Sequence, residues 1–227
     1  MPDNVGRCIF QARPTSPPTS LGGSPALGAK QQAGWGFQIL PYLEGENVWR
    51  AGPVLAIGTP NKVFFCPSRR GPQTLTTRDR YLPPVTGKRI THALCDYAAS
   101  NHENTGVVGH FLRLRMMDIA DGTSNTLLAG DKRLNRAYLG QRQHDDKLGY
   151  TAGWSSDTLR KTNLPPQPDY FASVGNGGKL FGSSHVGGIN VAFADGGVRA
   201  ISYSVSAVTF KRLGNKSDGQ VISGNDF

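Results

Sequence analysis

The sequence predicts an α+β fold, in which an antiparallel sheet packs on short helices and long irregular loops connect the elements. The segment 185–199 alternates apolar and polar residues around an Asp-Gly dipeptide, a pattern typical of a β-hairpin. Residues 34–49 carry apolar side chains at helical spacing, which predicts a short amphipathic helix. The 227 residues include 29 Gly and 15 Pro, and only 37% are hydrophobic. This composition favours a loop-rich domain with a modest core.

The predicted hairpin turns at Asp195-Gly196, a dipeptide that suits a two-residue type I′ turn because both central residues need positive φ. Ile189, Val191 and Phe193 would form the apolar face of its first strand. A two-residue turn also sets the register of the two strands. The expected pairs, with apolar partners on one face, are Phe193 with Val198, Val191 with Ala200 and Ile189 with Ser202.

The first half of the chain is expected to hold one helix and one clear strand. Phe37, Leu40 and Leu43 share one helical face. The apolar run at 62–70 predicts a short strand. Residues 93–101 fit either a strand or a loop.

In the second half, a turn at 121–122 is expected to lead into a strand through Thr126–Ala129. Ser204 or Ser206 can cap a short C-terminal helix that ends at Gly214. Residues 1–33 are rich in Pro, Ser, Gly and Thr and predict a flexible or extended lead-in, whereas residues 34–227 are expected to form a single domain.

The net charge of +9 favours acidic partners such as lipopolysaccharide, nucleic acid or anionic polysaccharide. The basic residues are scattered, however, with tight clusters at Arg69-Arg70 and Lys211-Arg212, so a solvated basic surface is the plainer interpretation. Nucleic-acid binding needs a basic face interleaved with aromatic residues; Arg113 and Arg115 alternate on a possible strand near Phe111, which is only a weak form of this pattern and does not favour such a partner. No run approaches the ~20 apolar residues of a membrane-spanning helix, and no signal peptide is visible.

The three cysteines are Cys8, Cys66 and Cys95, an odd number that fits no complete disulfide framework. Cys66 and Cys95 lie in the better-structured segments and could form a disulfide in an oxidising compartment. Three free thiols fit the sequence equally well.

Carboxylates near turns are the candidate metal ligands, because oxygen ligands from turns suit Ca²⁺. They are Asp118, Asp121, Asp131 and Asp195. Their spacing matches no EF-hand, and an Asp that precedes Gly usually stabilises its own turn through local backbone bonds. His185 could ligate a metal, but we favour a structural role in which its ring bonds a carbonyl or carboxylate and holds the loop before the hairpin.

The sequence does not indicate an enzyme. The run Gly182-Ser-Ser-His185 places serines beside a histidine, but adjacency in sequence is not the geometry of a catalytic triad, and no Gly-x-Ser-x-Gly elbow occurs. The long irregular region 135–180 could instead bind a glycan or small solute. Its candidate contact residues are Trp154, Tyr170, Phe171 and Asn176.

Five stretches, taken in order, resemble one known family. They are Trp35-Gly-Phe-Gln-Ile-Leu-Pro-Tyr-Leu-Glu44, Phe64-Phe-Cys-Pro-Ser-Arg-Arg70, Cys95-Asp-Tyr-Ala-Ala-Ser100, Asp118-Ile-Ala-Asp-Gly-Thr-Ser-Asn-Thr-Leu-Leu128 and the hairpin from His185 to Gly196. From Trp35 to Phe227 the chain resembles the large planctomycete family of prepilin-like proteins that end in a His-x9-Asp-Gly motif. Each motif is short, but the ordered set is specific.

The resemblance implies descent from type IV pilins or type II secretion pseudopilins, with a membrane-anchoring helix followed by an α+β head that faces outward. It also implies a cell-envelope or extracellular location and pilin-like or secretion-system subunits as partners. Some family members carry a solute-binding label. The first 33 residues of this chain contain neither the prepilin cleavage site nor the hydrophobic helix, so we expect no membrane anchor in it.

The leading hypothesis is therefore a non-enzymatic, pilin-like head domain for assembly or interaction at the cell envelope. In this interpretation one set of residues organises the structure: His185, Asp195, Gly196, Asp121 and Gly122. The first alternative is an extracellular module that binds a glycan, an anionic surface or a solute. The second is a metal-dependent hydrolase that uses His185, Asp195 and Asp121.

Overall fold

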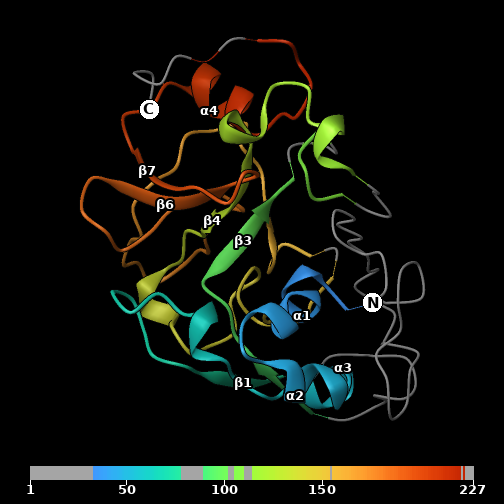
Figure 1. The fold of residues 1–227 in the computed structure, drawn as a ribbon. Helices are drawn as coiled ribbons and strands as arrows, with labels where there is room; N and C mark the ends of the chain where they lie inside the picture. Colours follow the sequence, from blue (N-terminus) through green and yellow to red (C-terminus); the bar gives the residue numbers. More distant parts are fainter. Residues whose placement is uncertain are drawn as a thin grey trace.

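The computed structural model describes residues 33–77, 89–101, 105–109, 114–153, 155–220 and 222. The lead-in predicted for residues 1–33 lies outside these residues except at residue 33, and Cys8, Phe111, Arg113 and Trp154 lie outside them as well. Within the described part, a five-stranded sheet is flanked by short helices, and a two-stranded sheet lies near one end (Figure 1). The predicted α+β class is confirmed.

The main sheet has the strand order β5-β3-β4-β6-β7. All neighbouring pairs are antiparallel except β3 with β5, which are parallel. The bounds are β3 Tyr97–Ser100, β4 Leu127–Asp131, β5 Leu159–Arg160, β6 Gly188–Phe193 and β7 Val198–Ser202. The second sheet pairs β1 Thr74–Thr77 with β2 Ile90–Ala93.

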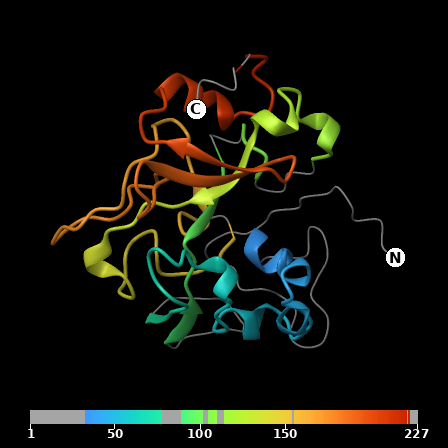
Figure 2. The ribbon, with the colours of Figure 1, turned by 60° about the vertical axis from the view of Figure 1, so that its left-hand side comes forward.

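The helices are all short and gather at two ends of the molecule. In both views the helices α1 to α3 lie on one side of the main sheet and α4 lies on the other (Figures 1 and 2). The α-helices are α1 Trp35–Gln38, α2 Glu46–Arg50, α3 Pro53–Ala56 and α4 Ala207–Leu213. The 3₁₀ helices are η2 Leu40–Tyr42, η3 Lys62–Phe64, η4 Met116–Asp118, η5 Thr123–Asn125 and η6 Arg136–Tyr138. No helix in this described part combines the length and apolar character needed to span a bilayer.

Two hydrophobic clusters form the core. The first surrounds Phe64, whose ring stacks on Tyr150 with centroids 4.4 Å apart and meets the edge of Trp35 at 6.3 Å. The second lies under the β6–β7 hairpin, where Phe181 meets Phe210 of α4 edge-on at 5.8 Å. The polar atoms of the large rings are satisfied, since Tyr150 Oη donates to the carbonyl of Ala56 and Trp35 Nε1 donates to that of Thr158. These contacts join the helical segment 35–64 to the segment 150–158.

The hairpin forms at the predicted place, but its turn and register differ from the prediction. Gly196 N donates to the carbonyl of Phe193 and Phe193 N donates to that of Gly197, so the loop has three residues, Ala194 to Gly196. Gly196 takes φ 87° whereas Asp195 has no positive φ, which is the pattern of a type I turn followed by a bulge glycine.

The additional loop residue shifts the pairing by one position, so the three predicted pairs are wrong. Ile189 pairs with Ile201 and Val191 pairs with Arg199. A shift of one residue exchanges the faces of a strand, and Val198 is accordingly 70% exposed while Ile201 is buried. The exchange also lays the Arg199 guanidinium over the Phe193 ring at 4.5 Å.

The other predicted elements agree in part with the structure. The C-terminal helix forms as α4, with the Ser206 side chain accepting a hydrogen bond from Thr209 N and Gly214 at its end. The strand predicted near residues 126–129 is β4. The strand predicted at 62–70 is wrong, because η3 and a turn occupy that segment and bury its aromatic residues. The ambiguous segment 93–101 contains β3.

The single helix expected over 34–49 is three separate short helices. Pro41 at the start of η2 removes a backbone donor there, and Glu44 at φ 56° reverses the chain before α2. Phe37 and Leu40 are nevertheless buried, as their helical spacing predicted.

Candidate functional site

Three side chains from distant segments meet beside the β4–β6 pair, and we call them the Cys66–Asp131–His185 cluster. Cys66 lies in the turn after η3, Asp131 ends β4 and His185 precedes β6. His185 Nε2 lies 3.5 Å from Cys66 Sγ and 3.7 Å from Asp131 Oδ2. One ligand-type atom from each residue lies within 4.8 Å of the other two.

Local hydrogen bonds hold each member of the cluster in place. The Cys66 amide donates to Asp96 Oδ2 at 3.0 Å, and Asn190 N donates to Asp131 Oδ2 at 2.9 Å across the strand pair. Two backbone hydrogen bonds hold the loop at His185. The His185 amide donates to Ser183 Oγ, and the His185 carbonyl accepts from Tyr203 Oη. The sheet register and these anchors therefore determine the approach of the three side chains.

The cluster is a poor nucleophilic site. A catalytic thiol is activated by one histidine nitrogen while the other nitrogen is held by a carboxylate, but here Nε2 alone faces both the thiol and the carboxylate. Burial, followed by the nearby Asp131 carboxylate, raises the pKa of the Cys66 thiol. The thiol is therefore protonated at neutral pH and lacks the reactivity of a thiolate.

The Asp131 carboxylate is incompletely satisfied. Its side chain is 1% exposed, yet Oδ1 has no hydrogen-bond partner among the described residues. Burial raises the pKa of Asp131. The His185 ring, by contrast, is 29% exposed and opens the cluster toward solvent. The amide nitrogen of the exposed Asn190 side chain lies 3.2 Å from His185 Nε2 at this open side.

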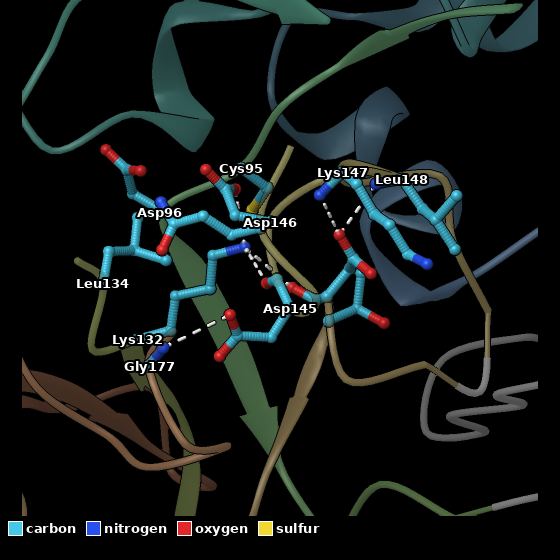
Figure 3. Close-up of polar contacts among 12 residues, drawn as sticks. Cys95, Asp96, Lys132, Leu134, Asp145, Asp146, Lys147, Leu148 and Gly177 are labelled. Carbon is cyan, nitrogen blue, oxygen red and sulfur yellow. Dashed lines mark hydrogen bonds and ion pairs between the residues drawn. The ribbon is translucent and has the colours of Figure 1, made fainter. Parts of the chain in front are cut away.

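A second set of charged groups lies next to the cluster and is closed to solvent. We call it the buried ion network; it contains Arg69, Arg70, Lys132, Arg160, Asp96, Asp145, Asp146, Asp157 and Asp169. Figure 3 shows the part of this network around Lys132 and Asp146.

Every cation of the buried ion network has several acceptors. Lys132 Nζ donates to Asp146 Oδ1 at 3.0 Å and to the carbonyls of Asp145 and Asp157. Arg70 donates two bonds to Asp146, at 2.7 and 3.0 Å, and one to Asp96. Burial acts to raise the pKa of Asp146, but the Lys132 ammonium and the Arg70 guanidinium outweigh it and lower that pKa to about 2.

The network also ties loops that lie far apart in the sequence. Arg69 Nε donates to Asp169 Oδ2 at 2.7 Å, and Asp157 Oδ1 accepts from the amides of Lys147 and Leu148. Asp145 accepts from Arg160 Nη2 and from the amide of Gly177. Ion pairs and hydrogen bonds to aspartate side chains thus hold the long irregular region 135–180 in place.

The interpretation of the basic residues as a solvated surface does not hold for Arg69 and Arg70. Both arginines are buried, and three aspartates, Asp96, Asp146 and Asp169, lie within ion-pair distance of them. The sequence shows the adjacent arginines but not that they are buried in ion pairs, because their aspartate partners lie 26 to 100 residues away.

Of the four carboxylates predicted as metal ligands, Asp131 lies in the Cys66–Asp131–His185 cluster, whereas the other three have separate partners. Asp118 pairs with Arg115 at 3.0 Å. Asp121 accepts the amides of Asp218 and Gly219, and Asp195 Oδ1 accepts the amide of Gly197. The structure brings neither Asp121 nor Asp195 to His185 in a group of three ligand-type side chains; among the described residues it brings Cys66 and Asp131 there instead.

Four of the five residues predicted as structural organisers, Asp121, Gly122, Asp195 and Gly196, lie in one connected region, whereas His185 lies before β6 against Cys66. Asp195 N donates to the carbonyl of Thr123, and Ala194 N donates to that of Thr126, so the hairpin turn docks on the segment that begins at Asp121. Gly122 and Gly196 both take positive φ, at 91° and 87°. These contacts support the structural interpretation of the motif.

Of the two alternatives for Cys66 and Cys95, a disulfide or free thiols, the structure has free thiols. Cys95 Sγ donates to the carbonyl of Tyr97 at 3.1 Å, and burial raises the pKa of this thiol to about 12. Cys66 Sγ lies instead against His185.

A cavity of about 400 Å³ opens beside the buried ion network. Its lining carries three lysines, at positions 147, 161 and 179, together with His144 and the buried Arg160. The aromatic residues predicted to bind a solute do not line it: Tyr170 stacks with Arg133 at 4.5 Å and Phe171 is 81% exposed, while Trp154 lies outside the described residues.

Comparison with known proteins gives one finding. The family model described as "Protein of unknown function (DUF1559)" matches residues 11–207. Neither a curated protein nor a solved structure shows a significant match to the chain.

Proposed function

Starting from the fact that the chain belongs to the DUF1559 family of proteins of unknown function, we propose that it is the non-enzymatic head domain of a pilin-like cell-envelope protein. In this role it is a rigid α+β body that presents loops for assembly or interaction with pilin-like or secretion-system subunits. The proposal combines the likeness of its ordered motifs to prepilin-like proteins with the use that the structure makes of its charged residues.

The buried ion network is the observation that carries the non-enzymatic part of the proposal. Its aspartates and cations pair with one another and with backbone groups, and Arg69, Lys132 and Arg160 are fully buried at their side chains. Charged groups used in this way stabilise loops and are unavailable as general acids or bases toward a substrate. The protonated Cys66 thiol points in the same direction.

Cell fractionation tests the location that this role requires. In cells that carry the gene, an antibody against the domain is expected to detect it in the envelope or in the fraction sheared from the surface, and cross-linking is expected to capture pilin-like subunits. Detection in the cytosol alone would overturn the proposal. So would turnover of an ester, phosphoester, glycoside or peptide substrate that the His185→Ala variant abolishes while His144→Ala retains it.

The basic cavity favours a second candidate function, a module that binds an anionic solute or glycan. Lys147, Lys161 and Lys179 all line this cavity; Lys179 is exposed and Lys147 is half-buried. A concave site lined by several lysines attracts carboxylate or phosphate groups.

Calorimetry with matched ligands tests this second function. Oligosaccharides of uronic acids are expected to bind and neutral oligosaccharides of equal length are not, with affinity falling as salt is added. The Lys147→Ala and Lys179→Ala variants should bind more weakly, and Lys211→Ala, which changes a lysine of α4 outside the cavity, should bind like the original protein. Equal binding by all three variants would contradict a role for the cavity.

A further inference from the structure

The Cys66–Asp131–His185 cluster offers a sulfur, a nitrogen and an oxygen to one point in space. Its ligand-type atoms lie within 4.8 Å of one another, and no EF-hand or Cys-x-x-Cys pattern announces it in the sequence. The cluster lies outside the buried ion network, whose groups are already paired, and outside the basic cavity.

The spacing of these atoms matches the edges of a tetrahedral metal site. Zinc bonds of about 2.3 Å to sulfur and about 2.0–2.1 Å to nitrogen or oxygen imply separations of roughly 3.6 Å between S and N and roughly 3.3 Å between N and O. The corresponding distances are 3.5 Å from Cys66 Sγ to His185 Nε2 and 3.7 Å from Nε2 to Asp131 Oδ2. The contacts with Cys66 and Asp131 both involve His185 Nε2, as the ligand atoms around one shared ion would.

An independent observation points to a missing partner at the same place. Asp131 is 1% exposed, and its Oδ1 has no hydrogen-bond partner among the described residues. Buried polar atoms without partners are rare in native proteins, and a bound water or ion is one of the explanations for such an atom. A cation bound to this carboxylate would compensate for its burial.

We propose that Cys66, Asp131 and His185 form a binding site for one divalent transition cation of the zinc class. Sulfur and imidazole ligands select such borderline-soft ions over Ca²⁺ or Mg²⁺, which require oxygen ligands. On binding, the thiol proton of Cys66 passes to solvent, and the thiolate and carboxylate charges neutralise the dication.

The surroundings of the cluster suit such a site. The ion can enter from solvent past the His185 ring, which is 29% exposed and next to the fully exposed Val186. Three protein ligands leave the fourth tetrahedral position to the open side, where the Asn190 side chain lies. Ser183 and Tyr203 fix the backbone at His185 and so set the direction of its ring.

Cobalt and zinc titrations of the chelator-treated, full-length protein test the proposal. We expect one ion per chain, and we expect the cobalt form to show tetrahedral ligand-field bands together with a thiolate-to-cobalt charge-transfer band. The charge-transfer band reports a bond to sulfur, which an ion held by surface histidines would lack.

Ligand variants locate the ion. Cys66→Ala and His185→Ala should each weaken zinc binding by more than the roughly 10- to 100-fold that loss of an outer-sphere group costs, and Asn190→Ala should fall within that range. The matched controls His144→Ala and Asp195→Asn change the same residue types outside the cluster and should bind like the original protein. Because His185 lies at the surface, its variant keeps the test sound if a change at the buried Cys66 impairs folding.

Two results would overturn the proposal. One is a zinc content no higher in the original protein than in His185→Ala. The other is a cobalt spectrum of the original protein that lacks the thiolate-to-cobalt band, or a thiolate-to-cobalt band that persists in the Cys66→Ala variant. Neither result bears on the envelope role, which is tested by fractionation and cross-linking.

Discussion

Asp131 and Lys132 follow one another on the chain, but their side chains enter environments that differ in how completely the charge is hydrogen-bonded. Lys132 Nζ enters the buried ion network, where it has three acceptors at 3.0–3.1 Å. Asp131 enters the Cys66–Asp131–His185 cluster, where one carboxylate oxygen has no partner among the described residues and the facing imidazole is partly exposed. Alternation along an extended chain sends the two side chains to different sides.

The difference between these two regions separates stabilisation from binding. A buried charge is tolerated when its hydrogen bonds are complete, as in the ion network. A buried carboxylate that lacks a hydrogen-bond partner costs stability, and a bound ion is one way to supply that partner. The buried ion network therefore stabilises the fold, and the Cys66–Asp131–His185 cluster is the proposed metal site.

Removing one member of the ion network should have the largest effect. Asp146→Asn leaves Lys132 and Arg70 buried with an incomplete set of acceptors, and breaking a buried ion pair in this way costs about 3–5 kcal/mol. Urea unfolding followed by tryptophan fluorescence measures the loss. The matched control Asp118→Asn breaks an exposed pair and should cost much less, because solvent screens such a pair. Equal losses for the two variants would contradict this difference.

Acid should weaken the network next. The pKa of Asp146 is about 2 in the folded protein, below the ordinary value of 3.8. Its contribution is therefore complete above pH ~4 and is lost as pH falls through 2. This shift corresponds to about 2 kcal/mol, measured as the difference in unfolding free energy between pH 5 and pH 2. The Asp146→Asn variant should lack that part of the acid-induced loss.

Neutralising the Asp131 carboxylate should increase the unfolding free energy, whereas the changes to the ion network decrease it. Asp131→Asn preserves the oxygen that can accept from Asn190 N and removes a buried charge. The metal-free variant is expected to gain about 1 kcal/mol in unfolding free energy. A loss comparable with that of Asp146→Asn would show that Asp131 belongs energetically to the ion network.

Removing the imidazole should have the smallest effect on the metal-free protein. The His185 ring is partly exposed and makes no short hydrogen bond within the cluster, so His185→Ala should change the unfolding free energy by less than about 1 kcal/mol. Thermal unfolding without metal measures this change. A larger loss would support the purely structural role predicted from the sequence, whereas zinc should raise the unfolding temperature of the original protein and leave that of the variant unchanged.

Much of the fold was predictable because it depends on local patterns. The alternation in 189–193 identified β6, and the serine at position 206 with the glycine at 214 bounded α4 as expected. The register was not predictable from Asp195-Gly196 alone, because that dipeptide fits both the two-residue turn that was expected and the three-residue turn that forms.

The candidate site was predictable only in its parts. His185 and Asp131 were considered as metal ligands, and Cys66 as half of a disulfide, but nothing in their spacing linked them. Cys66 and His185 are 119 residues apart, and they meet only because β4 pairs with β6 and because the turn after η3 packs on Asp96.

The sequence by itself determined the fold class, the hairpin and the C-terminal helix, since periodicity, capping and turn chemistry act over a few residues. Only the tertiary structure decided the strand register, the burial of Arg69 and Arg70, and the meeting of Cys66, Asp131 and His185. The burial of the arginines and the meeting of the three side chains depend on ion pairs and contacts between segments separated by 26 to 119 residues, whereas the register depends on which of two local turns the hairpin adopts. The energies of these ion pairs and contacts arise only when the chain has closed around them and excluded water.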